Sequence, residues 1–136
     1  MTDKIEVKET FWYEGGQLKS IENSKNGVPH GKRTRWDEDG QKTNEEHLIE
    51  GKIHGTQSTW YSNGQIKTEE NYKNDKREGV CKIWHENGQL SHEGNYKDGL
   101  QHGKISLWFE NGNQKVIQHR KNGKSHGYFK MWYENG

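Results

Sequence analysis

Histidine is the residue type in this chain most able to do chemistry, and four of the eight histidines recur at one spacing. His30, His54, His102 and His126 each precede a glycine, and Glu78 occupies the third position of the series. Equivalent residues of successive two-stranded repeats lie ~9–10 Å apart, whereas zinc ligands lie ~2.0–2.1 Å from their ion. We therefore expect no metal site. We expect each imidazole to hydrogen-bond the backbone of a turn.

Other residues that could support catalysis are few. Cys81 is the single cysteine, and we interpret it as a small buried hydrophobic residue rather than a nucleophile. The sequence contains no Gly-x-Ser-x-Gly, no phosphate-binding loop and no His-Glu-x-x-His motif. We predict a protein that is not an enzyme and that has no cofactor.

Tryptophan sets the period of the chain. The six tryptophans lie 24 residues apart, at Trp12, Trp36, Trp60, Trp84, Trp108 and Trp132. Two glycine series keep the same phase, one at Gly16, Gly40, Gly64, Gly88, Gly112 and Gly136 and the other at Gly31, Gly55, Gly79, Gly103 and Gly127. A third series places Asp75 where its other members have glycine, and Asp tolerates a left-handed backbone. A fixed period of this length indicates a repeat architecture.

Each tryptophan is followed by a predicted hairpin. Asn63-Gly64 has the composition of a two-residue type I′ turn, which needs a positive φ at both central residues. Such a turn places Tyr61 opposite Ile66, and the equivalent register in the second repeat places Arg33 opposite Glu46. We predict an all-β fold, an elongated single-layer twisted antiparallel sheet of repeated β-hairpins with two strands per repeat. Residues 1–10 form an N-terminal edge segment in this prediction, and residues 11–136 form five full repeats plus a truncated sixth.

The repeat resembles the MORN repeat, in particular its bacterial variant. The resemblance rests on the block WHENGQLSHEGNYKDGLQHGK, in which Tyr96-Lys97-Asp98-Gly99 and His102-Gly103 match the motif, and it extends from Phe11 to Gly136. It implies a single-layer grooved sheet with roles in scaffolding and self-association, and in some members contact with membrane lipid. Some bacterial proteins of this variant are described as antitoxins.

Strand alternation assigns side chains to two faces. The tryptophans lie on one, the Trp face, and we interpret them as mainly structural; the alternative is an aromatic groove for a glycan, choline or lipid. The other, the non-Trp face, is charged at Arg33 and Arg35 and becomes apolar toward the C-terminus. Either a partner covers its apolar part or curling of the sheet closes a local core there. The candidate residues for binding a partner or a second copy are Ile83, His85, Ile105, Leu107, Phe109, Phe129, Met131 and Tyr133.

Charge and hydropathy narrow the choice of partner. Lys plus Arg is 21 and Asp plus Glu is 20, a balance that argues against nucleic acid and makes a membrane-lipid headgroup the weaker alternative. No apolar run approaches the ~20 residues of a membrane helix, and the N-terminus lacks a signal-peptide core. We expect a cytoplasmic scaffold that binds a protein or another copy of itself, in one form as an antitoxin that neutralises its partner. The alternatives are a phospholipid-binding module and a glycan or choline binder.

Overall fold

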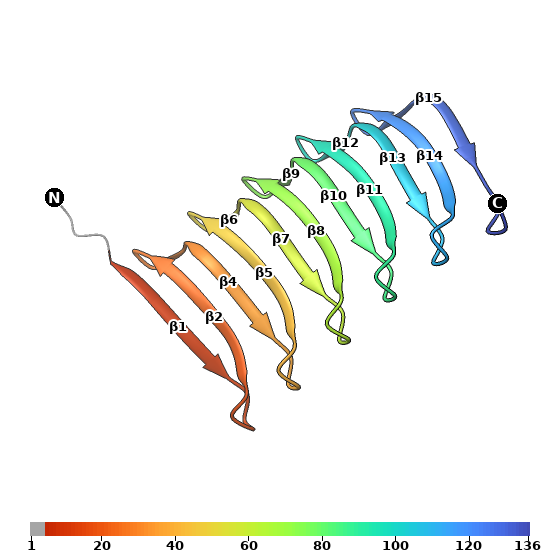
Figure 1. Cartoon of the computed structure of the whole chain (residues 1–136). Helices are drawn as coiled ribbons and strands as arrows, with labels where there is room; N and C mark the ends of the chain where they lie inside the picture. The colour runs from red at the N-terminus through yellow and green to blue at the C-terminus, as the bar shows by residue number, and fades with distance from the viewer. Residues whose placement is uncertain (1–4) are drawn as a thin grey trace.

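The computed structural model describes residues 5–136, which form one open antiparallel sheet of fifteen strands without a helix. Eleven strands follow one another across the sheet in chain order, from β1 at one edge to β15 at the other. Figure 1 shows these strands curved in the same sense, with no second layer over either face. The predicted single-layer sheet of hairpins is therefore confirmed.

The eleven long strands define the repeats. They are β1 (Glu6–Trp12), β2 (Leu18–Lys25), β4 (Gly31–Trp36), β5 (Lys42–Ile49), β7 (Gly55–Trp60), β8 (Ile66–Lys73), β10 (Gly79–Trp84), β11 (Leu90–Lys97), β13 (Gly103–Trp108), β14 (Gln114–Lys121) and β15 (Lys124–Met131). Four two-residue strands lie in the connections: β3 (Val28–Pro29), β6 (Lys52–Ile53), β9 (Lys76–Arg77) and β12 (Leu100–Gln101). Strand β1 includes residues 6–10 of the segment that the sequence set apart from the repeats.

The turns after the tryptophans differ from the predicted type. Tyr61 N–H donates to Gln65 O at 2.9 Å and Gly64 N–H to Tyr61 O at 3.0 Å, so the loop has three residues. Gly64 has a φ of 86°, but Asn63 does not have a positive φ. This is a type I turn followed by a left-handed glycine, the usual three-residue hairpin. The type I′ prediction for this turn was wrong.

The longer loop changes the register at the end of each hairpin. Trp60 pairs with Ile66, whereas Thr59 pairs with Thr68, and Lys67 is the extra residue of a β-bulge. The predicted pairing of Tyr61 with Ile66 was therefore wrong. Beyond the bulge, its extra residue offsets the extra residue of the loop, and the predicted pairing of Arg33 with Glu46 is confirmed.

Two-residue turns with two positive φ angles occur at the opposite end of the strands. Asp98 and Gly99 have φ angles of 51° and 83° between the paired residues Lys97 and Leu100. Asp75, which stands in a glycine position, has a φ of 67°, as its residue type predicted. A two-residue strand follows the tight turn and precedes the His-Gly or Glu-Gly step in four repeats, whereas His126-Gly127 lies within β15.

Neighbouring repeats hold the sheet together, because no second layer covers it. At the tight turns, Gly51 N–H donates to Pro29 O at 2.7 Å and Gly99 N–H to Arg77 O at 2.9 Å, each bond joining consecutive repeats. The buried apolar side chains are few and are spread along the array: Leu48, Cys81, Ile105 and Val116. Each repeat therefore depends on the next for most of its stability, as in other linear arrays.

We expect Gly88→Ala to lower the free energy of unfolding by about 1–2 kcal/mol, because Gly88 has a φ of 88° that costs a side-chain-bearing residue this much. The new Cβ would also lie 3.2 Å from Gln65 Oε1. Urea denaturation measures the loss. The control is Glu86→Ala in the same turn, for which a change within ~0.5 kcal/mol is expected. Equal stability of the two variants would contradict the turn geometry.

Candidate functional site

The register arranges the non-Trp face in two rows, the first across all eleven long strands and the second from β4 to β15. The first row consists of directly paired residues from strand to strand: Phe11, Ser20, Arg35, Asn44, Thr59, Thr68, Ile83, His92, Leu107, Val116 and Met131. Beside it runs the second row: Arg33, Glu46, Gln57, Glu70, Cys81, Gly94, Ile105, Gln118 and Phe129. From Ser20 in the first row and Arg33 in the second, both rows are polar as far as β8, and from β10 onward both are mainly apolar.

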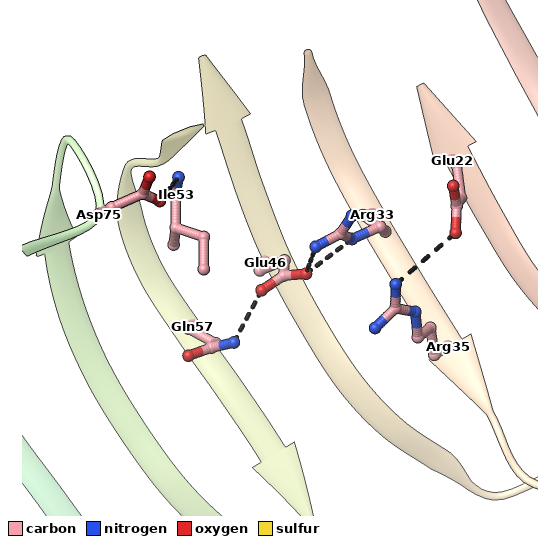
Figure 2. A network of polar contacts seen from close by, with 7 residues as sticks. All are labelled: Glu22, Arg33, Arg35, Glu46, Ile53, Gln57 and Asp75. Atoms are coloured by element: carbon pink, nitrogen blue, oxygen red, sulfur yellow. Dashed lines mark hydrogen bonds and ion pairs between the residues drawn. The ribbon is translucent and has the colours of Figure 1, made fainter. Parts of the chain in front are cut away.

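Buried ionic contacts form the polar part of the second row (Figure 2). Arg33 Nε donates to Glu46 Oε1 at 2.7 Å, and its Nη2 bonds to the same oxygen. Gln57 Nε2 donates to the other carboxylate oxygen at 2.7 Å. Glu46 is only 2% exposed, so its charge depends on these two partners. The Arg35–Glu22 pair nearby is longer, at 3.8 Å, and more exposed.

Glu70 organises a polar cluster in the middle of the same row. Its carboxylate lies 2.8 Å from Arg77 Nη2 and accepts hydrogen bonds from Tyr72 Oη at 2.9 Å and from Cys81 Sγ at 3.6 Å. Burial, together with the charge of Glu70, raises the pKa of the Cys81 thiol to about 11. Such a thiol is almost entirely protonated at neutral pH, so the cluster does not provide an activated nucleophile.

The C-terminal half of the non-Trp face is apolar. Ile105 is fully buried, Ile83 and Leu107 are half-buried, and Phe129 and Met131 on β15 are 56% and 67% exposed. The first row thus gives a continuous line of apolar side chains interrupted only by His92, which is paired with both Ile83 and Leu107. Burial and the charge of Arg77 lower the pKa of His92, which favours its neutral form. This apolar half is the candidate binding surface.

Three of the predicted surface residues lie outside the strands. His85, Phe109 and Tyr133 follow the last residues of their strands and belong to the turns. His85 Nε2 lies 3.0 Å from Trp108 O in the next repeat, and Lys115 Nζ lies 5.3 Å from the ring centre of Phe109. His85 N–H donates to Gln89 O at 2.8 Å and Phe109 N–H to Asn113 O at 2.9 Å, so these two residues close the three-residue loops of their hairpins. As members of the binding surface, these three residues remain a prediction.

The tryptophans lie on the Trp face in a polar surrounding. Around Trp36 the surface carries Thr34, Lys42 and Glu45, and Lys42 Nζ lies 5.3 Å from the ring centre of Trp60 in the next repeat. The bulge residue Lys67 lies over a tyrosine, with its Nζ 5.5 Å from the ring centre of Tyr61.

The predicted histidine series lies where the tight turns enter the next long strand. His30 Nδ1 accepts a hydrogen bond from Glu50 N–H at 3.3 Å, and Glu78 Oε2 accepts the equivalent bond from Asp98 N–H at 2.7 Å. Glu78 therefore replaces histidine with another acceptor. Among the described residues, the buried Nδ1 atoms of His54 and His102 have no hydrogen-bond partner, so the predicted bond to the turn was wrong for these two. Within residues 5–136, no three His, Cys, Asp or Glu side chains are grouped so that they could hold a metal ion.

Comparison with known proteins identifies the repeat. The family model described as MORN repeat variant matches residues 5–26, 53–74 and 77–98. No curated protein sequence matches the chain. In residues 5–136, no helix has the length and apolar character needed to cross a membrane.

We expect Arg33→Met to lower the free energy of unfolding by about 3 kcal/mol, because it leaves the buried Glu46 carboxylate with Gln57 as its one polar partner. The matched control is Arg35→Met, which removes an exposed pair and should cost under ~1 kcal/mol. Denaturant titration of both variants tests this difference. Equal losses would contradict the buried ion pair.

Acid should destabilise the array through His92. Its pKa is lowered in the folded chain, so below pH ~6.5 the unfolded chain binds a proton that the folded chain does not. The stability that neutral His92 contributes is therefore present above that pH and is lost as the pH falls. We expect His92→Gln to show a smaller fall in melting temperature between pH 7 and pH 5.5 than the wild type. An equal fall in the two proteins would contradict this role.

Proposed function

Because this chain is a MORN repeat protein of the variant type, we propose that it is a non-enzymatic scaffold that binds protein through the apolar half of its non-Trp face. The family supports the general role of a repeat scaffold. The choice of face and of a protein partner is inferred from the surface itself.

The continuous apolar line on the non-Trp face carries this proposal. Ile83, Leu107 and Met131 lie in one row, and Phe129 lies beside them in the second row. Ile105 belongs to the second row as well, but it is fully buried and supports the surface by packing instead of contacting a partner. Large contiguous apolar patches are rare on monomers and mark interaction sites. The rigid strands also hold these side chains at fixed spacing before a partner binds, which limits the entropy that binding must remove.

The chemistry of this surface fits a protein better than the other candidate ligands. Methionine and aromatic side chains are enriched at the centre of protein interfaces, and Phe129 and Met131 are the exposed side chains of this type on the non-Trp face of β15. A surface for anionic lipid would need a basic cluster, whereas the basic residues Arg33 and Arg35 are engaged by Glu46 and Glu22.

The partner can be a second copy or a different protein, and the proposal covers both. Neutralisation of a toxin remains a prediction that rests on the resemblance alone. A toxin would use the same surface as any other protein partner, so the surface does not distinguish the two. A lipid or glycan ligand is an outcome that the following experiment would reveal.

We expect a photo-crosslinking amino acid at Phe129 to form a covalent product with a protein, either a second copy or another partner, in cells that express the chain from its own gene. The control places the same amino acid at Tyr128, which is equally exposed at 54% but lies on the Trp face. Met131→Asp should abolish the product at position 129, because it puts a charge in the apolar row. Mass spectrometry and light scattering identify the product and its mass.

A product that forms equally from both faces, or that survives Met131→Asp, would overturn the assignment of the surface. Absence of a protein product at position 129, together with flotation of the chain on anionic vesicles, would favour the lipid alternative.

A further inference from the structure

Side chains at the turns after the tryptophans join consecutive hairpins. Tyr13 Oη donates to Trp36 O at 2.9 Å, and Tyr61 Oη donates to Trp84 O at 2.7 Å. In the next repeat His85 takes the place of the tyrosine, with its Nε2 at 3.0 Å from Trp108 O. Each bond spans 23 residues and joins the tip of one hairpin to the end of a strand in the next. These contacts were not predicted from the sequence.

A second set of bonds joins the same tips. Asn63 Nδ2 donates to Glu86 O at 2.9 Å, Asn87 Nδ2 to Glu110 O at 2.8 Å and Asn111 Nδ2 to Glu134 O at 3.1 Å. We call the two sets together the tip ladder. It fixes the distance between consecutive hairpins at the end of the sheet farthest from the tight turns.

The tip ladder is interrupted after the second hairpin. Asp37 stands at the position of Tyr13 and Tyr61, and Asp39 at the position of Asn63. An ionised carboxylate has no hydrogen to donate to a carbonyl oxygen. Asp37 Oδ1 instead accepts bonds from Asp39 N–H at 3.0 Å and Gln41 N–H at 2.9 Å in its own turn. Across the described residues 5–136, this junction alone lacks a side-chain hydrogen bond from one tip to the next.

The same junction is held firmly away from the tip. Gln57 Nε2 on β7 donates to Glu46 Oε2 on β5 at 2.7 Å, as Figure 2 shows. Closer to the tight turn, His54 N–H donates to His47 O at 2.9 Å. At the tip end, Lys42 Nζ lies 5.3 Å from the ring centre of Trp60. The junction is thus fixed at one end and weakly held at the other.

We propose that the junction between β5 and β7 is the hinge of the array. The sheet opens there at the turns that contain Asp37 and Asn63, and it pivots about the Glu46–Gln57 contact. Strands β7 to β15 then move as one unit relative to β1 to β5. This inference does not depend on the proposed function. The hinge lies within the polar part of the non-Trp face, so the Arg33–Glu46 pair and the apolar part from β10 onward lie on opposite sides of it. Opening therefore changes the angle at which these two parts meet a partner.

Distances between spin labels on the turns test the hinge. Labels at Glu38 and Glu86 span the β5–β7 junction and the following one, whereas labels at Ser62 and Glu110 span two junctions that keep the tip ladder. Both pairs cross four strand spacings, or about 19 Å. Cys81→Ala removes the native thiol from both labelled proteins. We expect the distance distribution by pulsed electron paramagnetic resonance to be at least twofold wider for the first pair.

Two sets of substitutions separate the hinge from local disorder. Asp37→Tyr with Asp39→Asn restores the donors and should narrow the Glu38–Glu86 distribution to the width of the control pair. Tyr61→Phe with Asn63→Ala removes both bonds from the next junction and should widen the Ser62–Glu110 distribution. Equal widths in the starting proteins, or a Glu38–Glu86 width that the restored donors leave unchanged, would overturn the hinge. Neither readout requires a partner, so failure of the proposed function would leave this result intact.

Discussion

The structure depends on one constraint: a single-layer sheet has no second layer to bury its side chains, so each repeat must be stabilised by its neighbours. The left-handed glycine in every tryptophan turn makes this possible, because it ends each hairpin at the same point of the 24-residue period. Equivalent strands then align, and main-chain bonds such as Gly99 N–H to Arg77 O join one tight turn to the next. The stability of the array is consequently distributed along the sheet instead of concentrated in one core.

Alignment of the repeats also creates the surface on which a scaffold role rests. The residue that stands as Arg33 in one repeat stands as Gln57, Cys81, Ile105 and Phe129 in later ones, so the same position passes from charged to apolar along the array. Glu46 lies on β5 between two of these residues, and its carboxylate can be buried there because Arg33 and Gln57 both bond to it. Sequence variation at a fixed structural position thus converts a repetitive sheet into a surface with a polar and an apolar half.

Much of this arrangement could be predicted from the sequence, since period and alternation determine which strand residues share a face; the Arg33–Glu46 pair is one example. The turn type could not, because Asn-Gly suits a two-residue type I′ loop and a three-residue loop equally. The latter is stabilised here by Asn63 Oδ1, which accepts the Gln65 N–H at 2.9 Å. This one added residue shifts the pairing at Trp60, which lies opposite Ile66. The tip ladder could not be predicted either, because its bonds start from side chains whose positions depend on the turn type.

The central claim is that bulged hairpins align apolar side chains of successive repeats in one row on the non-Trp face. Nuclear Overhauser effects in the isotope-labelled protein test it most directly. The structure requires cross-strand contacts from Leu107 to Val116 and from Val116 to Met131, together with pairing of Trp108 with Gln114. Contacts that instead pair Trp108 with Lys115 and Phe109 with Gln114 would show unbulged two-residue turns and would contradict the account.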